Sequence, residues 1–427
     1  MDTTRRALLR GIAAVPFAVT AGGLSVPSVA RAAEPEYRLR RYDRDGTPTG
    51  TTWAAAIQGL KTEERLAVAG LVGDVLGRAE RRASRPGDWR DGAGSAPKPD
   101  GLDFAFGWDT RAAYRQDAVG DRWYPQGITT SYDAHGGSVP GSGGRKVALV
   151  SWYDRRSGGN QGARVSVVDI TRTGASSLPR YDHVLLVIPA KESGEPYDFR
   201  VTELHAGGVA WAGRWLYVAD KDHGLYVFDT ASVLKVSRGS TAAARRRARA
   251  WCGYHGGDGT YYAHGYRYVM PLHHVYRPAG GSAALRYSQV SLDRTQGAAR
   301  SLVVSEYFET SADGVAVRWD LDSAGHLTAE RSTSVWPLRI PRVQGAVCVG
   351  DRTYYSANAS LPPDGADAGA EQGELWLQYP RGEKMTAPRG KLSLGPEDLS
   401  YQPRTRGGSL WGLAEHPGRR RVYRIRL

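Results

Sequence analysis

Cysteine is scarce in this chain, with only Cys252 and Cys348 among 427 residues. Neither cysteine stands in a C-x-x-C motif, so the sequence gives little indication of a zinc or dithiol redox site. In an oxidising compartment the two thiols would be able to pair. The disulfide Cys252–Cys348 is therefore one of two open alternatives, the other being two free thiols.

Several well-known catalytic motifs are also missing. The sequence contains no G-x-S-x-G elbow, no H-E-x-x-H helix and no EF-hand loop. Its glycine-rich stretches, such as GGSVPGSGG at 136–144, lack the Lys-Ser/Thr ending of a phosphate-binding loop. Beyond the first 32 residues, no apolar run is long enough to cross roughly 30 Å of hydrocarbon, so we expect no transmembrane segment in the mature chain.

Phenylalanine is rare, whereas the other aromatic residues and glycine are abundant. The chain has 6 Phe against 12 Trp, 23 Tyr and 53 Gly. Tyrosine and tryptophan combine a large apolar area with a polar group, and glycine supplies turns. This composition favours an all-β architecture and would also suit a sugar-binding surface.

The N-terminus has the layout of a signal peptide. A charged start, MDTTRRALLRG, is followed by a short apolar run and by Ala30-Arg31-Ala32, which matches the A-x-A cleavage pattern. The adjacent Arg5 and Arg6 resemble the twin-arginine signal that a dedicated translocase reads. We expect cleavage after Ala32 and a secreted, extracellular protein. Because a twin-arginine substrate folds before export, a disulfide would form late or not at all.

The chain is basic, with a formal net charge of +13. The leader accounts for a small part of this excess, so the mature protein remains clearly positive. Such a charge favours anionic partners such as cell-wall polymers or acidic glycans, although it does not locate a site. The run Arg245-Arg246-Arg247 with Arg249 is expected to mark an exposed loop or a contact with anionic wall polymers. In an exported protein we expect no nucleic-acid partner.

The composition divides the chain into three parts: the signal peptide at 1–32, an N-terminal helical segment and linker at 33–102, and a β-rich domain at 103–427. Apolar residues recur at helical spacing within 51–84, which predicts a helix there, or two helices if Thr62 begins a second one. A stretch rich in proline and glycine at 85–101 predicts a linker.

A weak internal repeat runs through the β-rich part. Each unit has an entry segment, an apolar second strand and a third strand rich in valine and aromatics, clearest in HAGGVAWAGRWLYVADKDHGLYVFD at 205–229. Five such units predict a β-propeller of five four-stranded blades. The chain ends on a third strand, so an N-terminal strand near Tyr37 or near Phe104 would complete the last blade. A hidden sixth or seventh blade and a pair of β-sandwiches remain open alternatives.

This blade pattern, over 123–427, resembles that of bacterial, actinobacterial-like propeller proteins exported by the twin-arginine route, whose activity is mostly unassigned. The resemblance implies the architecture and leaves the chemistry open, since propellers serve as hydrolases, lyases, lectins and scaffolds.

The entry position of every unit is polar, and the residues are Gln126, His205, Gln289, Gln344 and Glu397. In a propeller these positions would face one central channel. Such a ring would bind a polar ligand, calcium through oxygen ligands, or another divalent metal through His205 and Glu397, which are also the catalytic candidates. The alternative is a channel that holds only ordered water.

Our leading hypothesis is therefore a secreted propeller, expected to be monomeric, that binds a glycan or cell-wall component at the channel mouth. The aromatic residues expected to stack on the ligand are Trp123, Tyr124, Trp152 and Tyr153. Alternatives are a hydrolase or lyase, metal-assisted through the ring, and a non-enzymatic scaffold. Paired carboxylates would suit glycoside hydrolysis, and the predicted turns contain the acids and histidines Asp154, Asp220, Asp222, His223, Glu306, Glu415 and His416.

Three more histidines lie close together in the sequence: His264, His273 and His274. Because neighbouring residues of a strand point to opposite faces, His273 and His274 are not expected to share one metal ion. His264 together with one of them would be able to bind an ion, and the alternative is that these are buried, hydrogen-bonded histidines.

Overall fold

The computed structural model describes residues 35–45, 50–86, 98–174, 177–294, 300–358, 372–404 and 407–427. Two compact units divide the chain, Met1–Pro35 and Glu36–Leu427. The predicted signal peptide and its cleavage point lie outside the described residues, as does most of the predicted linker. Among the described helices, none combines the length and the apolar character needed to cross a membrane.

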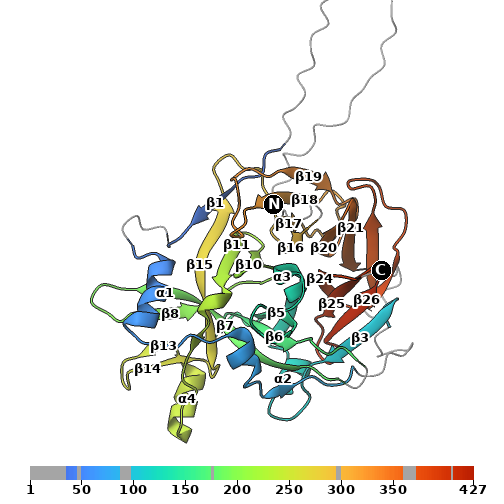
Figure 1. The fold of residues 1–427 in the computed structure, drawn as a ribbon. Coiled ribbons are helices and arrows are strands. Elements are labelled where there is room, and N and C mark those ends of the chain that lie inside the picture. The colour runs from blue at the N-terminus through green and yellow to red at the C-terminus, as the bar shows by residue number, and fades with distance from the viewer. Residues whose placement is uncertain are drawn as a thin grey trace, which may run out of the picture. The chain divides into compact units, whose positions relative to one another are not determined.

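The second unit is built mostly of β-strands, which confirms the all-β prediction (Figure 1). Its strands form five antiparallel groups of four. The groups are β4 (Trp123–Thr130), β5 (Val147–Asp154), β6 (Ala163–Asp169) and β7 (Arg180–Lys191); β9 (Val209–Ala212), β10 (Trp215–Asp220), β11 (Gly224–Asp229) and β15 (Tyr268–Pro278); β16 (Gln289–Asp293), β17 (Arg300–Ser305), β18 (Val315–Leu321) and β19 (Ser334–Pro337); β20 (Val343–Val349), β21 (Arg352–Asn358), β22 (Gln372–Gln378) and β23 (Gly390–Leu394); and β24 (Pro396–Pro403), β25 (Gly408–Ala414), β26 (Arg421–Arg426) and β3 (Leu102–Gly107).

The first three strands of each group coincide with the entry, second and third segments of the predicted repeat. The first two groups are not separate sheets. A parallel pairing of β7 with β15, where Val269 lies opposite Leu185, joins them into one twelve-stranded sheet together with β1 (Leu39–Tyr42), β2 (Arg81–Arg82), β8 (Tyr197–Val201) and β12 (Leu234–Lys235).

An N-terminal strand completes the last group. β3 pairs with β26, and Phe106 lies opposite Val422. Of the two segments considered from the sequence, the one near Phe104 takes this place, whereas β1, near Tyr37, pairs with β15. The last group therefore combines one strand from Leu102–Gly107 with three strands that begin at or after Pro396 in the sequence.

The first strands of the five groups contact one another in a closed order, β4, β9, β16, β20, β24 and back to β4. Glycine makes the close approach possible. A Cβ atom on Gly208 would lie 2.8 Å from the Cα of Gln289, and one on Gly345 would lie 2.8 Å from the Cα of Asp398. Any larger residue at either position would push neighbouring strands apart.

The carboxyl group of Asp398 ties these first strands together. Its Oδ2 accepts hydrogen bonds from the backbone N–H groups of Ile128 on β4 (3.1 Å) and Val209 on β9 (3.2 Å). Its Oδ1 accepts from Nε2 of Gln289 on β16 at 3.3 Å and from the N–H of Leu399 at 2.8 Å. A single buried side chain thus satisfies donors from four of the five groups.

The long helix predicted over 51–84 is wrong in extent. α1 (Trp53–Thr62) ends after ten residues, and Leu71–Leu76 forms a separate π-helical turn. Between them Arg65 has a φ of 56°, and Val68 forms a β-bridge with Leu234. Pairing with a distant strand outweighs the local helical preference of this segment.

Three short helices were not predicted: α2 (Gln116–Val119), α3 (Ser131–His135) and α4 (Ala242–Ala250). The arginine run that the sequence placed in an exposed loop lies on α4. Thr241 caps this helix, because its side chain accepts a hydrogen bond from the N–H of Ala244.

Of the two alternatives left open for the cysteines, the structure has two free thiols and no disulfide between Cys252 and Cys348. Cys252 lies on β13 (Cys252–His255), whereas Cys348 is buried on β20 beside Tyr355. They belong to different hydrophobic clusters, so the geometry of a disulfide is not met. Burial raises the pKa of Cys252 to about 12 and that of Cys348 to about 11, which keeps both thiols protonated.

Replacing Asp398 tests its role in closing the ring. We expect Asp398→Ala to lower the free energy of unfolding by more than about 3 kcal/mol, because each buried donor left without an acceptor costs about 1–3 kcal/mol. Asp398→Asn keeps a carbonyl oxygen and should lose much less. Urea denaturation measures both. The exposed Asp351→Ala is the control, and equal losses for Asp398→Ala and Asp351→Ala would contradict this role.

A second buried carboxyl makes stability depend on pH. Asp133 accepts hydrogen bonds from Ser400 and Thr129, and burial raises its pKa to about 6. The unfolded value is about 3.9, so between about pH 4 and 6 the folded state binds the extra proton. Stability contributed by Asp133 should therefore fall as the pH rises through this window. Asp133→Asn should flatten that dependence, as measured by urea denaturation from pH 4 to 7; parallel curves would refute the assignment.

Candidate functional site

Four of the five predicted ring residues line one cavity of about 420 Å³: Gln126, His205, Gln344 and Glu397. This volume lies within the range of small-molecule sites. The remaining lining residues are Tyr153, Gly207, Asp220, Lys221, Asp222, Ser288, Tyr307 and Glu415. The polar entry position of the sequence repeat thus corresponds to four of the residues that line this cavity.

β-Bulges direct three of these side chains. The pairing register shifts between Pro125 and Ile128 on β4, between Val343 and Gly345 on β20, and between Pro396 and Leu399 on β24. Gln126, Gln344 and Glu397 lie within these irregularities. A bulge inserts an extra residue into one strand and re-aims its side chain, and such bulges are frequent beside binding sites.

His205 is positioned by a strained backbone in the connection that precedes β9. The residue after it, Ala206, has a φ of 54°, a conformation that is uncommon for residues other than glycine. The imidazole packs against the ring of Tyr153, with ring centroids 4.5 Å apart. Desolvation lowers the pKa of His205, so the ring is neutral at physiological pH.

Two glutamates of the cavity influence each other. Burial raises the pKa of Glu397 well above its usual range, and the nearby charges of Glu415 and Asp398 add to the effect. Burial also raises the pKa of Glu415, but a hydrogen bond from Nε2 of Gln126 (2.8 Å) and the charge of Arg420 oppose it. The two carboxyls therefore have unequal environments, and Glu397 holds its proton more strongly.

Tyr153 and Asp220 complete the titratable lining. Burial, together with the negative charge of Glu415, raises the pKa of Tyr153 to about 12. Oδ2 of Asp220 lies at hydrogen-bond distance from Nδ1 of His223 (2.9 Å), and burial raises the pKa of Asp220. The cavity thus offers hydroxyl, amide, imidazole and carboxyl groups within a partly desolvated space.

Gln289, the fifth ring residue, does not reach the cavity. It is fully buried; its Nε2 donates to the backbone oxygen of Ala346, and its Oε1 accepts from Ser305. The expected ring of five residues around an open channel is therefore wrong for Gln289, because the strands pack too closely there for a channel. Four of the five residues line one cavity, and the amide of Gln289 has a structural role.

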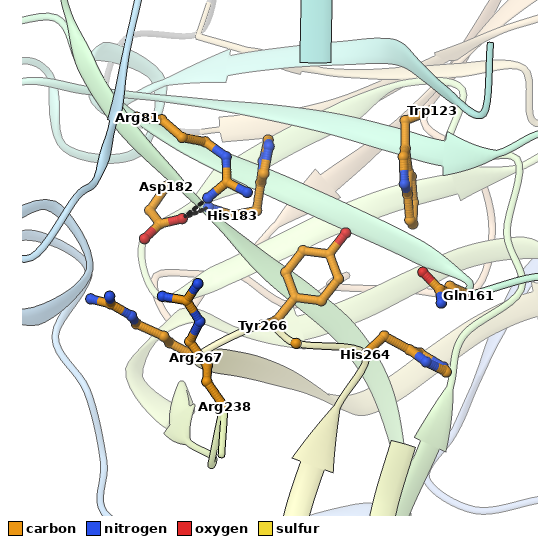
Figure 2. A pocket seen from close by; sticks show the side chains of 10 residues that line it. Arg81, Trp123, Gln161, Asp182, His183, Arg238, His264, Tyr266 and Arg267 are labelled. Carbon is orange, nitrogen blue, oxygen red and sulfur yellow. Dashed lines mark hydrogen bonds and ion pairs between the residues drawn. The ribbon is translucent and has the colours of Figure 1, made fainter. Parts of the chain in front are cut away.

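Of the four aromatic residues expected at the rim, only Tyr153 lines this cavity. Trp152 is fully buried and donates to Ser166 (2.8 Å), since alternate residues of β5 face opposite sides. Trp123 lines a second cavity (Figure 2). Tyr124 is buried and packs beneath the guanidinium of Arg420.

Two of the five acids noted in predicted turns have structural partners away from this cavity. Asp154 pairs with Arg122 at 2.5 Å, and Glu306 accepts hydrogen bonds from the N–H groups of Arg286 and Val315. Only Asp220, Asp222 and Glu415 reach the cavity. Glu415 was one of several acids in the sequence, and nothing local distinguished it as the neighbour of Glu397.

The prediction that His273 and His274 point apart is wrong. The register between β11 and β15 shifts at this point, with His274 opposite Val227 and Leu272 opposite Phe228. The extra residue brings the two Nδ1 atoms to 3.0 Å. His264 lies elsewhere, beside the cavity of Figure 2.

Metal binding at the predicted ring was a second expectation. Within the residues that the structure describes, no group of three or more His, Cys, Asp or Glu side chains is arranged to hold a metal ion.

No protein-family model matches the chain, and no curated protein matches its sequence. One of the solved structures that match this chain is a protein of Parabacteroides distasonis ATCC 8503 described as a "putative glycoside hydrolase". It is 12% identical, the match covers 80% of this chain and 96% of that one, and the TM-score is 0.31.

The coupling between the two glutamates is directly measurable. Glu415→Gln removes a nearby negative charge, so the pKa of Glu397 should fall toward its usual range. Carboxyl-carbon NMR titration of glutamate-labelled protein would follow the Glu397 resonance. The control is Glu309→Gln, whose side chain is 68% exposed. An unchanged Glu397 midpoint in Glu415→Gln would show that the two carboxyls do not interact.

Proposed function

We propose that the five four-stranded groups are the blades of a five-bladed β-propeller. The closed order of contacts among the first strands supports this arrangement. So does the completion of the last group by β3, since propellers commonly close their ring with a strand from the other terminus. The parallel contact of β7 with β15 is then an additional link between two neighbouring blades.

Within this architecture, we propose that the protein is exported through the twin-arginine route and binds a glycan in the 420 Å³ cavity. The observation that carries the proposal is the convergence of Gln126, His205, Gln344 and Glu397 with Tyr153. Sugar hydroxyls need both donors and acceptors in fixed positions, and these amide, carboxyl and imidazole groups supply them. The face of an aromatic ring beside them provides apolar contact for a sugar ring.

The carboxyl pair favours a second candidate function, glycoside hydrolysis. Such enzymes use one protonated carboxyl as general acid and one ionised carboxylate as base or nucleophile. Glu397 keeps its proton because of burial and neighbouring negative charge, which suits the acid. Glu415 receives a hydrogen bond from Gln126 and lies near Arg420, both of which favour its ionised form. Unequal environments of this kind separate the two roles.

A glycan array probed with the mature protein, followed by calorimetry on the retained glycan, tests binding. Tyr153→Ala should weaken affinity at least about tenfold, a loss of roughly 1.4 kcal/mol, because the aromatic face is removed. Tyr379→Ala, at a site where the side chain is exposed, is the control. If no glycan is retained, or if both variants bind like the parent, glycan binding in this cavity is excluded.

The retained glycan also tests hydrolysis. Glu397→Gln should lower turnover by about 10²–10⁴, the usual contribution of a general acid, and leave binding intact. The parent's rate should fall as the pH rises through the pKa of Glu397, since only the protonated acid can donate. Equal turnover in Glu397→Gln and Glu309→Gln would reject the acid role, while glycan binding alone would stand.

A further inference from the structure

A second cavity, of about 220 Å³, lies beside β2 and β7 and carries arginine side chains (Figure 2). Arg81, Arg238 and Arg267 line it, together with Asp182 and Tyr266. Gln161, His264 and Trp123 lie across the Tyr266 ring from these guanidinium groups (Figure 2). None of this lining overlaps with the 420 Å³ cavity.

Carboxylates hold the three guanidiniums in place from the protein side. Arg81 donates to Asp182 (2.5 Å) and to the buried Asp117 (3.0 Å). Arg238 and Arg267 both pair with Glu80. Arg238 and Arg267 keep 44% and 28% of their side chains exposed. The guanidiniums are thus oriented before any ligand arrives, which reduces the entropy that binding must overcome.

α4 extends the basic surface beyond the cavity. The backbone oxygen of its Arg249 lies 3.3 Å from Nδ1 of His264, a residue of the cavity lining. Arg245, Arg246 and Arg249 are exposed, and no ion pair links them to a carboxylate in the described part of the chain, whereas Arg247 pairs with Asp258. Arg245 and Arg249 are four residues apart on one helix face, a like-charge arrangement that destabilises the helix.

An exposed aromatic side chain ends this helix. Trp251 follows α4 directly and is 45% exposed, although it is a large apolar residue. Guanidiniums beside an open aromatic face match a polymer that carries both negative charge and flat apolar sugar faces. Clustered like charges and an exposed tryptophan both cost stability, and an anionic partner would offset both.

We propose that this surface binds an acidic polysaccharide, with one uronic acid unit in the 220 Å³ cavity and the following units along α4. The guanidiniums of Arg238 and Arg267 bind the carboxylate in the forked geometry that arginine favours. The Asp182 carboxylate then accepts a hydrogen bond from one sugar hydroxyl, and the Gln161 amide donates a hydrogen bond to another. A bare phosphate polymer fits less well, because it has no hydroxyl group to donate to the Asp182 carboxylate.

Calorimetry on the mature protein tests this site with three probes: an oligogalacturonate, its methyl ester of the same length, and polyphosphate. Esterification removes the negative charge and leaves the sugar unchanged. We expect the free acid to bind at least about tenfold more tightly than either other probe, as a charge-assisted pair requires. Binding should weaken with added salt, as expected for a polyanion that exchanges counterions.

Variants assign the binding to the named residues. Arg238→Gln should weaken oligogalacturonate binding about tenfold. Glu80 is not left unpaired in this variant, because it still forms an ion pair with Arg267. Arg245→Gln with Arg246→Gln should weaken it and reduce the salt dependence, since both side chains are exposed. The exposed Arg389→Gln carries the same charge change elsewhere and should bind like the parent.

Four results would overturn the proposal: no binding of oligogalacturonate, equal binding of the methyl ester, equal or tighter binding of polyphosphate, or an equal loss in Arg389→Gln. Glu397→Gln should leave this binding unchanged, because Glu397 lies in the other cavity. Failure of the glycan-binding proposal for the 420 Å³ cavity is therefore distinguishable from failure here.

Discussion

The Asp398 carboxyl group is the point on which the arrangement of strands depends. Its two oxygens accept hydrogen bonds from β4, β9 and β16 as well as from its own strand. Burial raises the pKa of this group, which shows how unfavourable its isolated charge would be at this position. The surrounding donors make its burial tolerable, and glycine at Gly208 and Gly345 lets the strands come close enough to supply them.

The same close packing determines where a ligand can bind. With Gln289 buried and bonded to Asp398, Ala346 and Ser305, the middle of the strand ring offers no space. The polar residues of the other strands are instead directed to one end by β-bulges at Gln126 and Gln344 and by the bulge that contains Glu397. The tightly packed centre and the polar cavity therefore both follow from the way the first strands of the five groups pack against one another.

Two buried carboxyl groups behave in opposite ways: Asp117, which binds Arg81 beside the 220 Å³ cavity, and Glu397, which lines the 420 Å³ cavity. Asp117 is fully buried, yet His183, Arg164 and Arg81 hold its pKa well below the usual range despite the opposing effect of burial. Glu397 is equally buried, but its charged neighbours are the acids Glu415 and Asp398, and its pKa rises. The first environment favours a fixed charge that orients arginines, whereas the second favours a proton that can be donated.

The local pattern of the sequence was sufficient to predict the first three strands of every group. Valine and aromatic residues that alternate between Gly and Asp turns are a local signal, because the pattern depends only on residues close in the sequence. β3 was also one of the two segments considered as the fourth strand of the last group. The shared polar position before each apolar strand also predicted four residues of the cavity.

The tertiary structure decided everything that depends on register and on distant partners. A shift of one residue in a pairing turns a side chain to the other face, and the sequence contains no sign of the bulges that aim Gln126 or bring His273 beside His274. Glu415 joins Glu397 only because β24 and β25 pair through such an irregularity. The long predicted helix ends at Thr62 because Val68 bridges to Leu234, far along the chain. Local preference specified the elements, and contacts between distant segments specified their direction and the site.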